Sequence, residues 1–417
     1  MDRTLVVRLN PTPEQAHILA RTLQAHTECF NVVARTGFES GCSSGVELHK
    51  QTYYPLRAKS PELPAQLVCA ARVKATEAVK SALTWQQKHA ARYAELVAEG
   101  QKQGRRPPKF KPVRCPQSTC APIRYDQRSF WVKWESMTAS LATVSGRVEI
   151  GFTVPKHARQ YLGGKVCSAD LCSRQGYYFL HIVVSLPAPG VSPCQEVMGV
   201  DLGLTHPAVT SKRTFLGDRR WKEQERRLFR LRRQLQQKGT KSAKRHLKKL
   251  SGKLFRQRKD HDHVLSKRLV QNATPGSTIV LENLSHIRER VTHRWGEGRR
   301  RMHSWSFAQL QSFLAYKAEA QGSEVVKIDP RHTSQTCSRC GHQARTNRRS
   351  QSLFRCRNCG YCLNADLNAS YNIRDKYVSS LASVGTPSLV GRPSSGLSSQ
   401  PLAGRDKPPD LSVGSLD

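Results

Sequence analysis

The stretch that decides the fold reads Cys337-Ser-Arg-Cys340-Gly and Cys356-Arg-Asn-Cys359-Gly, with 15 residues between Cys340 and Cys356. Four thiolates at two such spacings are the ligands of a tetrahedral structural Zn²⁺. A closed Cys₄ set leaves no open position for a reactive water, so this zinc is expected to brace the chain. The sequence therefore predicts a zinc ribbon at about residues 333–362, and four free thiols or a redox pair are the alternatives.

Three acids stand where a metal-dependent nuclease would use them. Asp201 and Glu282 end the apolar, strand-like runs 197–201 and 278–282, and Asp366 begins a predicted helix just after the ribbon. Burying a carboxylate among apolar residues is costly without a cation, and acids at strand ends can converge at one sheet edge. Carboxylate oxygens suit Mg²⁺, and two such ions can assist phosphodiester hydrolysis. We therefore predict metal ligands here, with a solvated cap or a surface salt bridge as the alternative for each acid.

Composition points to a nucleic-acid partner. The 417 residues carry a formal charge of +37, which disfavours an ordinary metabolic enzyme and attracts polyanions. No apolar run approaches the roughly 20 residues that span a bilayer, and the first residues do not resemble a signal peptide. Reduced intracellular thiols are therefore expected for most of the 13 cysteines. Two looser pairs, at 115/120 and 167/172, are the alternative for a second zinc site.

The first half alternates between strand and helix signals. Residues 3–9 alternate as a strand, and Thr12-Pro-Glu-Gln15 predicts a capped helix start. Helical periodicity returns at about 62–99, and residues 122–187 have strand texture. We expect the early strand and the later ones to share a barrel or sheet. Four aromatic residues of the later region could stack on bases or fill the core: Tyr125, Phe130, Trp131 and Trp134.

The second half begins with a strand at 197–201 and its expected hairpin partner at 208–210. A long basic helical segment follows at 218–271, and residues 211–260 contain 20 Lys and Arg against 4 Asp and Glu. Such an excess repels itself unless phosphate neutralises it, whereas a solvated face is the alternative. The expected backbone contacts are Arg226, Arg227, Arg230, Arg233, Lys244, Lys248 and Lys249. A basic loop at 288–301, a helix at 305–321, a strand at 324–329 and a helix at about 365–377 complete this half.

Several of these stretches closely resemble the TnpB family, whose members are encoded by IS200/IS605-type insertion sequences and are related to Cas12 nucleases. Its three split RuvC motifs match Gly199-Val-Asp201-Leu-Gly203, Leu281-Glu282-Asn283 and Asp366-Leu-Asn368-Ala. The family's segment before the first cysteine pair matches His332-Thr-Ser-Gln-Thr-Cys337, and its opening resembles Val7 to Gln15. The resemblance covers about residues 1–377. It departs at Asn364, where many members have an acid.

The resemblance implies an RNA-guided DNA endonuclease with guide RNA and target double-stranded DNA as partners, acting in a prokaryotic cytoplasm. By the family pattern Asp201, Glu282 and Asp366 are catalytic with two Mg²⁺, and one Zn²⁺ is structural. A miniature CRISPR effector of the Cas12 type would share the chemistry and differ in the source of its guide. A nuclease-inactive RNA-guided DNA-binding repressor is disfavoured by the intact acids. A transposase with its own strand-transfer chemistry lacks a convincing tyrosine or His-hydrophobic-His signature here.

The expected fold class is α+β and multidomain. Residues 1–190 would form a β-barrel-like wedge module with an inserted helical recognition module at about 12–110, which binds guide RNA and a flanking DNA motif. Residues 191–377 would form an RNase H-like (RuvC) nuclease domain that contains the basic helices and the zinc ribbon. Residues 378–417, rich in Ser, Gly, Pro and Leu, are expected to be a disordered tail.

Overall fold

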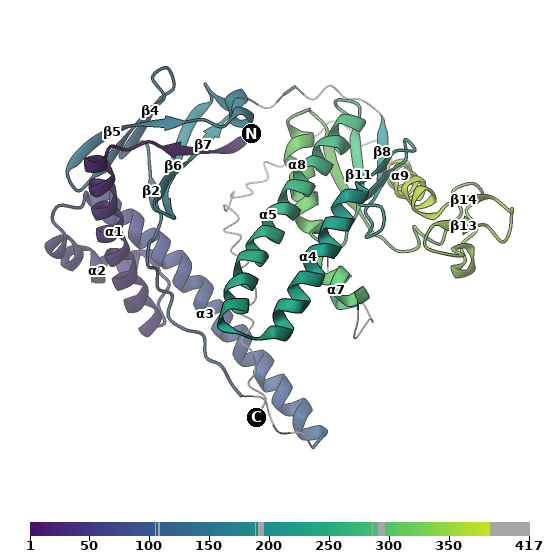
Figure 1. Ribbon diagram of the computed structural model, residues 1–417, viewed down its shortest axis with the longest axis horizontal. Coiled ribbons are helices and arrows are strands. Elements are labelled where there is room, and N and C mark those ends of the chain that lie inside the picture. The colour runs from purple at the N-terminus through teal and green to yellow at the C-terminus, as the bar shows by residue number, and fades with distance from the viewer. Residues whose placement is uncertain are drawn as a thin grey trace. The chain divides into compact units, whose positions relative to one another are not determined.

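The computed structural model describes residues 1–104, 106, 109–187, 189–190, 196–285, 287–290 and 297–383. The chain divides into two compact units, Met1–Pro187 and Ala188–Asp417, and each combines helices with a β-sheet (Figure 1). In the described residues, no helix is both long and apolar enough to cross a membrane.

A seven-stranded sheet, in the order β2-β6-β7-β1-β5-β4-β3, forms the first unit. The first strand, β1 (Asp2–Leu9), pairs antiparallel with both β7 (Tyr177–Ser185) and β5 (Gly146–Thr153), as predicted. The edge strand β3 contacts β6, so the sheet curls into a near-barrel. Its other strands are β2 (Ile123–Tyr125), β3 (Phe130–Lys133), β4 (Thr138–Thr143) and β6 (Lys165–Arg174).

Three helices lie between β1 and β2 in the sequence: α1 (Pro13–Glu39), α2 (Gly45–Lys59) and α3 (Ala65–Lys102). The capping box between Thr12 and Gln15 is confirmed, with both reciprocal hydrogen bonds present. The helix α2 was not predicted from the sequence; Ser44 caps it, and it contains Pro55. A short 3₁₀ helix, η1 (Lys156–Tyr161), follows β5.

The four aromatic residues of the strand region divide between the core and the surface. Tyr125 and Phe130 are buried, and Trp134 packs edge-to-face against Phe152 with ring centroids 6.1 Å apart. Trp131 is 54% exposed. The core interpretation is therefore correct for Tyr125, Phe130 and Trp134. The exposed ring of Trp131 has Lys133 Nζ 5.4 Å from its centroid and stays a candidate for stacking on a base.

A five-stranded sheet, in the order β10-β9-β8-β11-β12, forms the centre of the second unit. Its parallel strands are β8 (Val197–Asp201), β11 (Thr278–Glu282) and β12 (Glu324–Ile328). The predicted hairpin partner β9 (Ala208–Thr210) pairs antiparallel with β8, and β10 (Phe215–Leu216) extends the edge. Val200 pairs with Leu281, so the strand-end acids that follow them lie at the same edge of the sheet.

The basic segment predicted at 218–271 forms two helices, α4 (Arg219–Lys238) and α5 (Lys241–Asn272). Gly239, with φ +62°, ends the first in the left-handed conformation that glycine tolerates, and Thr240 caps the second. The expected loop at 288–301 is partly helical, because α6 (Ile287–Arg290) and α7 (Glu297–Ser304) overlap its two ends. Residues 291–296 lie outside the described residues.

The remaining helices of this unit are α8 (Phe307–Glu319) and α9 (Ala365–Ser383). The last one extends beyond its predicted end, so residues 378–383 are helical and do not belong to a disordered tail. The rest of that predicted tail, 384–417, lies outside the described residues. Between α8 and α9 the chain forms η2 (Arg345–Asn347) and a small hairpin of β13 (Leu353–Arg355) and β14 (Cys362–Asn364).

Candidate active site and cysteine ribbon

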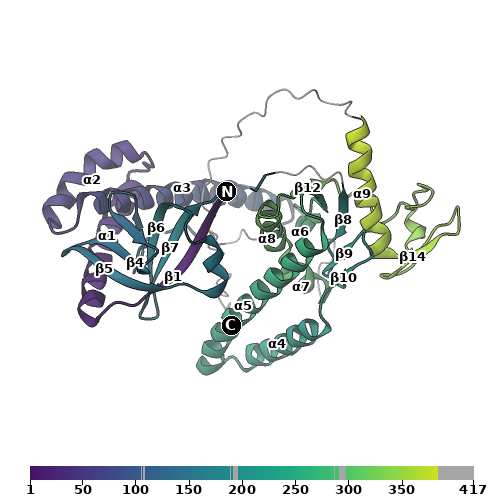
Figure 2. The same ribbon diagram turned by 90° about the horizontal axis from the view of Figure 1, so that it is seen from above.

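The three predicted acids come from three adjacent elements of the second unit. Asp201 ends β8, Glu282 ends β11, and Asp366 lies in the first turn of α9. Figure 2 shows α9 running alongside β8. This approach depends on Gly199, because a Cβ atom there would overlap the backbone carbonyl oxygen of Ser370 on α9. A glycine on the central strand thus allows the helix to bring its acid to the sheet edge.

The acids are close enough to influence one another electrostatically. Burial, followed by the carboxylates of Glu282 and Asp366, holds the pKa of Asp201 well above its usual range. Burial also raises the pKa of Glu282, and a hydrogen bond that Thr333 Oγ1 donates to its Oε1, at 2.5 Å, opposes that rise. Buried carboxyl groups that lie close together and have raised pKa values are typical of a functional site.

Asp366 already has a partner on each carboxylate oxygen. It is 4% exposed; Arg348 Nη2 donates to its Oδ1 at 3.1 Å, and His206 Nδ1 lies 2.8 Å from its Oδ2. Sequence analysis assigned neither partner to the acids. Arg348 was only one of several ribbon arginines, and nothing in the sequence marks His206 beyond its place shortly after Asp201. A bidentate set of partners of this kind holds the carboxylate in one orientation.

Asn364, the departure from the family pattern, caps α9. Its Oδ1 accepts hydrogen bonds from the backbone N–H groups of Asp366, at 3.0 Å, and Leu367, at 3.2 Å. An amide satisfies these two free donors as an N-cap without adding a fourth negative charge to the acid cluster. The substitution therefore has a local structural reason.

Two asparagines of α9 fasten the helix to the segment that carries the first cysteine pair. Asn368 Nδ2 donates to Thr336 O at 2.8 Å, and its Oδ1 accepts from Ser338 N–H at 3.1 Å. Asn372 Nδ2 donates to the carbonyl oxygens of Thr333 and Thr336, both at 2.7 Å. The ribbon and the helix that bears Asp366 are therefore one connected structure.

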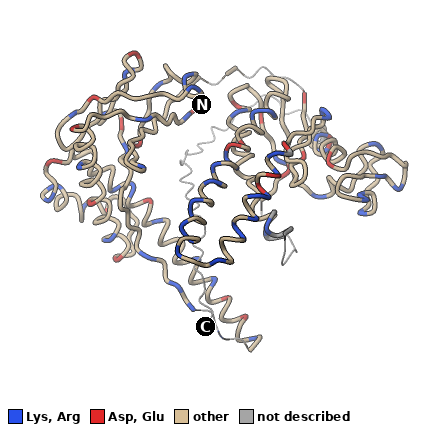
Figure 3. Tube along the Cα trace, viewed as in Figure 1, with Lys and Arg blue, Asp and Glu red and all other residues tan. Residues whose placement is uncertain are grey.

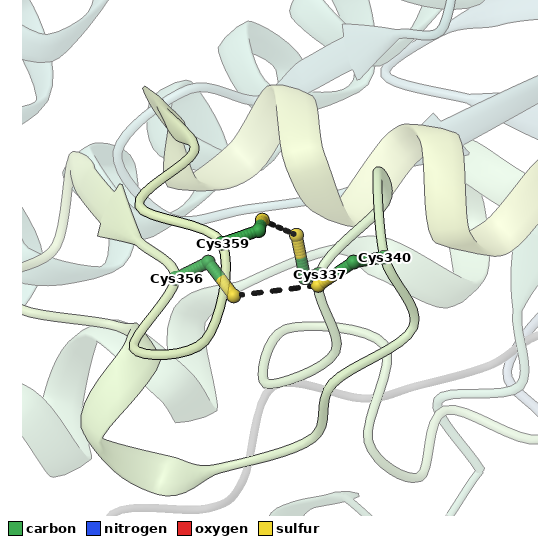
Figure 4. Close-up of side chains that lie close together, drawn as sticks. All are labelled: Cys337, Cys340, Cys356 and Cys359. Atoms are coloured by element: carbon green, nitrogen blue, oxygen red, sulfur yellow. Dashed lines mark hydrogen bonds between the residues drawn. The ribbon is translucent and has the colours of Figure 1, made fainter.

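The four predicted cysteines converge, as Figure 4 shows. Their sulfur atoms lie within 4.8 Å of one another, with Cys337–Cys359 at 3.8 Å and Cys340–Cys356 at 3.6 Å. Tetrahedral geometry with Zn–S bonds of about 2.3 Å requires sulfur atoms about 3.8 Å apart, so the set fits a zinc ion. Within the described residues, no other three or more His, Cys, Asp or Glu side chains bring their ligand atoms this close together, and this holds for the three acids as well.

The basic hairpin, formed by α4 and α5, has an apolar inner side and a cationic outer side. Leu235, Leu250 and Leu254 pack between the helices. Figure 3 shows Lys and Arg along both helices. All seven predicted contact residues are exposed, and none has an ion-pair partner within the described residues. Arg226, Arg230 and Arg233 follow helical spacing and share one face.

The raised pKa of Asp201 predicts how stability depends on pH in the absence of metal. The contribution of Asp201 to the free energy of unfolding is fully present below the pKa of this residue in the unfolded chain, near 4. That contribution is lost as the pH rises through the higher pKa that Asp201 has in the folded protein. Asp201→Asn should therefore raise the melting temperature at neutral pH, by about 2–4 °C for each ~1 kcal/mol of relief, and have little effect near pH 4. Calorimetry in chelator tests this. The control is Asp329→Asn, which changes an exposed acid after β12 and should leave the melting temperature unchanged. Equal melting temperatures of Asp201→Asn and the parent at neutral pH would contradict the expectation.

Two family models match segments of the chain between residues 181 and 373. The model described as "Probable transposase" matches residues 181–285, which contain Asp201 and Glu282, and the model described as "Cas12f1-like, TNB domain" matches residues 307–373, which contain the cysteines and Asp366. A TnpB-like protein of Methanocaldococcus jannaschii is 35% identical over 131 residues, or 31% of this chain and 46% of the relative. The chain is related to the TnpB family.

Other relatives of that lineage are similar over different lengths. The protein named CRISPR-associated endodeoxyribonuclease Cas12f1 from Sulfoacidibacillus thermotolerans is 40% identical over 30% of this chain and 29% of its own. Escherichia coli InsQ, named a putative RNA-guided DNA endonuclease, is 29% identical over 54% of this chain and 60% of its own. The matches thus span less than two thirds of these relatives. A solved Cas12f1–sgRNA–target DNA complex shares the fold, with a TM-score of 0.57 at 16% identity over 87% of this chain and 83% of that one.

Proposed function

We propose that the chain is an RNA-guided DNA endonuclease associated with an insertion sequence, and that it hydrolyses target DNA in a prokaryotic cytoplasm. The proposal is supported by the placement of the acids: Asp201 and Glu282 end neighbouring parallel strands, and the carboxylate of Asp366, on α9, helps to raise the pKa of Asp201. All three lie in the two segments that the family models match. The names of InsQ and Cas12f1 support both the guide and the reaction. The order of the mixed sheet and the acids at its strand ends support an RNase H-like (RuvC) assignment.

In this proposal the three acids would hold two Mg²⁺ ions, whose chemistry would be activation of a water and stabilisation of the leaving 3′ oxygen. The buried carboxylates suit that charge, since without a cation burial opposes their ionisation. Thr333 orients Glu282, and His206 orients Asp366. Arg348 adds a positive charge beside Asp366, where a scissile phosphate would be attracted. The four cysteines would hold one structural Zn²⁺, which would fix the positions of Arg348 and α9 relative to each other.

The two units divide the binding work. We assign the binding of guide RNA and of the flanking DNA motif to the seven-stranded sheet and helices α1–α3 of the first unit. We assign contacts with the paired guide RNA and target DNA strand to the basic hairpin of the second unit. Unpaired exposed cations bind backbone phosphate irrespective of sequence, so the choice of target would come from pairing with the guide.

The basic hairpin should govern the salt dependence of binding. Replacing Arg226, Arg230 and Arg233 together by Gln should weaken DNA affinity and reduce the slope of log K against log[salt] by about 2–3, because each phosphate contact contributes about 0.9. Fluorescence anisotropy over a salt series measures the slope. The same charge change in the first unit, at the exposed residues Arg128, Lys156 and Arg159, should alter it less. Equal slopes for the two triple variants would argue against a specific role for the hairpin.

Sequencing the RNA that co-purifies with the full chain tests the proposed function most directly. One RNA species should dominate, and with Mg²⁺ the complex should cut DNA that matches its guide segment and leave unmatched DNA intact. A mixture of cellular RNAs with no dominant species, or cleavage independent of the match, would overturn the proposal.

A further inference from the structure

A separate cavity lies beside the acids in the second unit. Its volume is about 170 Å³, and its walls come from α4, α5, the end of α7, the start of α8 and the loop after β8. It exceeds the space of one water and is smaller than the 300–1,000 Å³ typical of drug-sized ligands. A cavity of this size accommodates one planar ring system.

Two elements connect this cavity to the acid cluster. Pro207 lines it, and the preceding residue, His206, contacts Asp366. Leu310 lines it, and the following residue, Gln311, donates from Nε2 to the backbone oxygen of Glu282 at 3.0 Å. The cavity wall and the acid cluster are therefore joined through two pairs of consecutive residues.

The walls offer an aromatic surface and two unused polar atoms. Trp221 and His261 stack with ring centroids 4.2 Å apart and planes 17° apart. Asp262 is 8% exposed, and its Oδ2 has no hydrogen-bond partner among the described residues; Arg258 Nε is likewise buried and unpaired. A buried acceptor and a buried donor left unused are costly, which is typical of a site completed by a ligand.

We propose that this cavity takes one unpaired nucleobase of the strand led to the acids, and that Asp262 favours a base with an exocyclic amine. The proposal rests on the proposed function for the identity of the strand. Stacking on aromatic side chains suits any base. Cytosine and adenine also present an amine beside a ring-nitrogen acceptor, which matches Asp262 Oδ2 and Arg258 Nε. Thymine presents a carbonyl oxygen in place of that amine, and this oxygen would face the carboxylate.

Photocross-linking locates the base without requiring cleavage. The full chain with its co-purified RNA is irradiated with matched oligonucleotides that carry 5-iodocytosine or 5-iodouracil, and cross-linked peptides are mapped by mass spectrometry. Cross-links should fall at Trp221 or His261 and be about 2–10-fold stronger for cytosine, the effect of one hydrogen bond. Cross-links confined to other aromatic residues, or equal yields for the two bases, would overturn the proposal.

A matched pair of variants assigns the preference to one side chain. Asp262→Asn should remove or reverse the cytosine preference, because an amide can donate to the uracil oxygen. Asp260→Asn, the same change at an exposed position of the same helix, should retain it. An unchanged ratio in Asp262→Asn would contradict the role of this carboxylate, and the wild-type ratio tests the cavity even if that variant folds poorly. Base-dependent cross-linking without cleavage would refute the nuclease proposal alone, whereas cleavage without it would refute the cavity proposal alone.

Discussion

Asp201→Ala should abolish cleavage of guide-matched DNA while leaving DNA and RNA affinity nearly unchanged. Asp201 lies at the end of the central strand, and the carboxylates of Glu282 and Asp366 both raise its pKa. Its loss would remove a ligand from the proposed metal site. Loss of an outer partner of a metal ligand typically costs about 10–100-fold, and we expect loss of this carboxylate to exceed that range. Initial rates on labelled target DNA, with affinity measured separately, check both parts.

The chain supplies a matched control for that experiment. Asp329 directly follows β12, a parallel strand of the same sheet, in the way that Asp201 ends β8. The side chain of Asp329, however, is 54% exposed. Asp329→Ala should therefore cleave at nearly the parent rate. Cleavage retained by Asp201→Ala, or lost equally in both variants, would refute the assignment of the acids.

Cys337→Ser should prevent zinc from binding at the proposed Cys₄ site and, as a result, disorder residues 333–362. Apparent binding free energies of about 10–16 kcal/mol for zinc in small Cys-rich modules show how much of such folding the metal supplies. Metal content by mass spectrometry should fall from one zinc per chain to almost none, and limited proteolysis should cut within the ribbon. Cleavage should fall as well, because Arg348 and the contacts of Asn368 depend on the ribbon.

Cys362→Ser is the control for the metal experiment. This thiol is exposed and lies outside the cluster of four, although it is close in sequence. It should keep full zinc content and activity. Full zinc content in Cys337→Ser, or equal loss in both variants, would show that the ribbon does not hold the metal as a Cys₄ site.

Short contacts link the cysteine ribbon to the acid cluster. The ribbon delivers Arg348 to Asp366, and the asparagines of α9 anchor the ribbon in return. A change at the cysteines should therefore affect the acids without touching them. This coupling distinguishes a bracing metal from one that takes part in the reaction.

The sequence alone determined the features that depend on short-range pattern. The cysteine spacing, the capping box of α1, and the apolar runs that end in Asp201 and Glu282 are local, and local geometry follows from residue type. The proline inside α2 is a local signal against a helix. The helix forms nevertheless, because tertiary packing of its apolar face outweighs that signal.

Only the tertiary structure decided which distant side chains meet. His206 and Arg348 reach Asp366 from the loop after β8 and from the ribbon, at sequence separations of 160 and 18. Their contact depends on how closely α9 packs on β8 at Gly199, and on a ribbon held by its cysteines. Pairing of this kind is set by the packing of whole elements, which residue spacing does not encode. The sequence thus predicted which acids and cysteines form the candidate sites, and the fold brought His206 and Arg348 to Asp366.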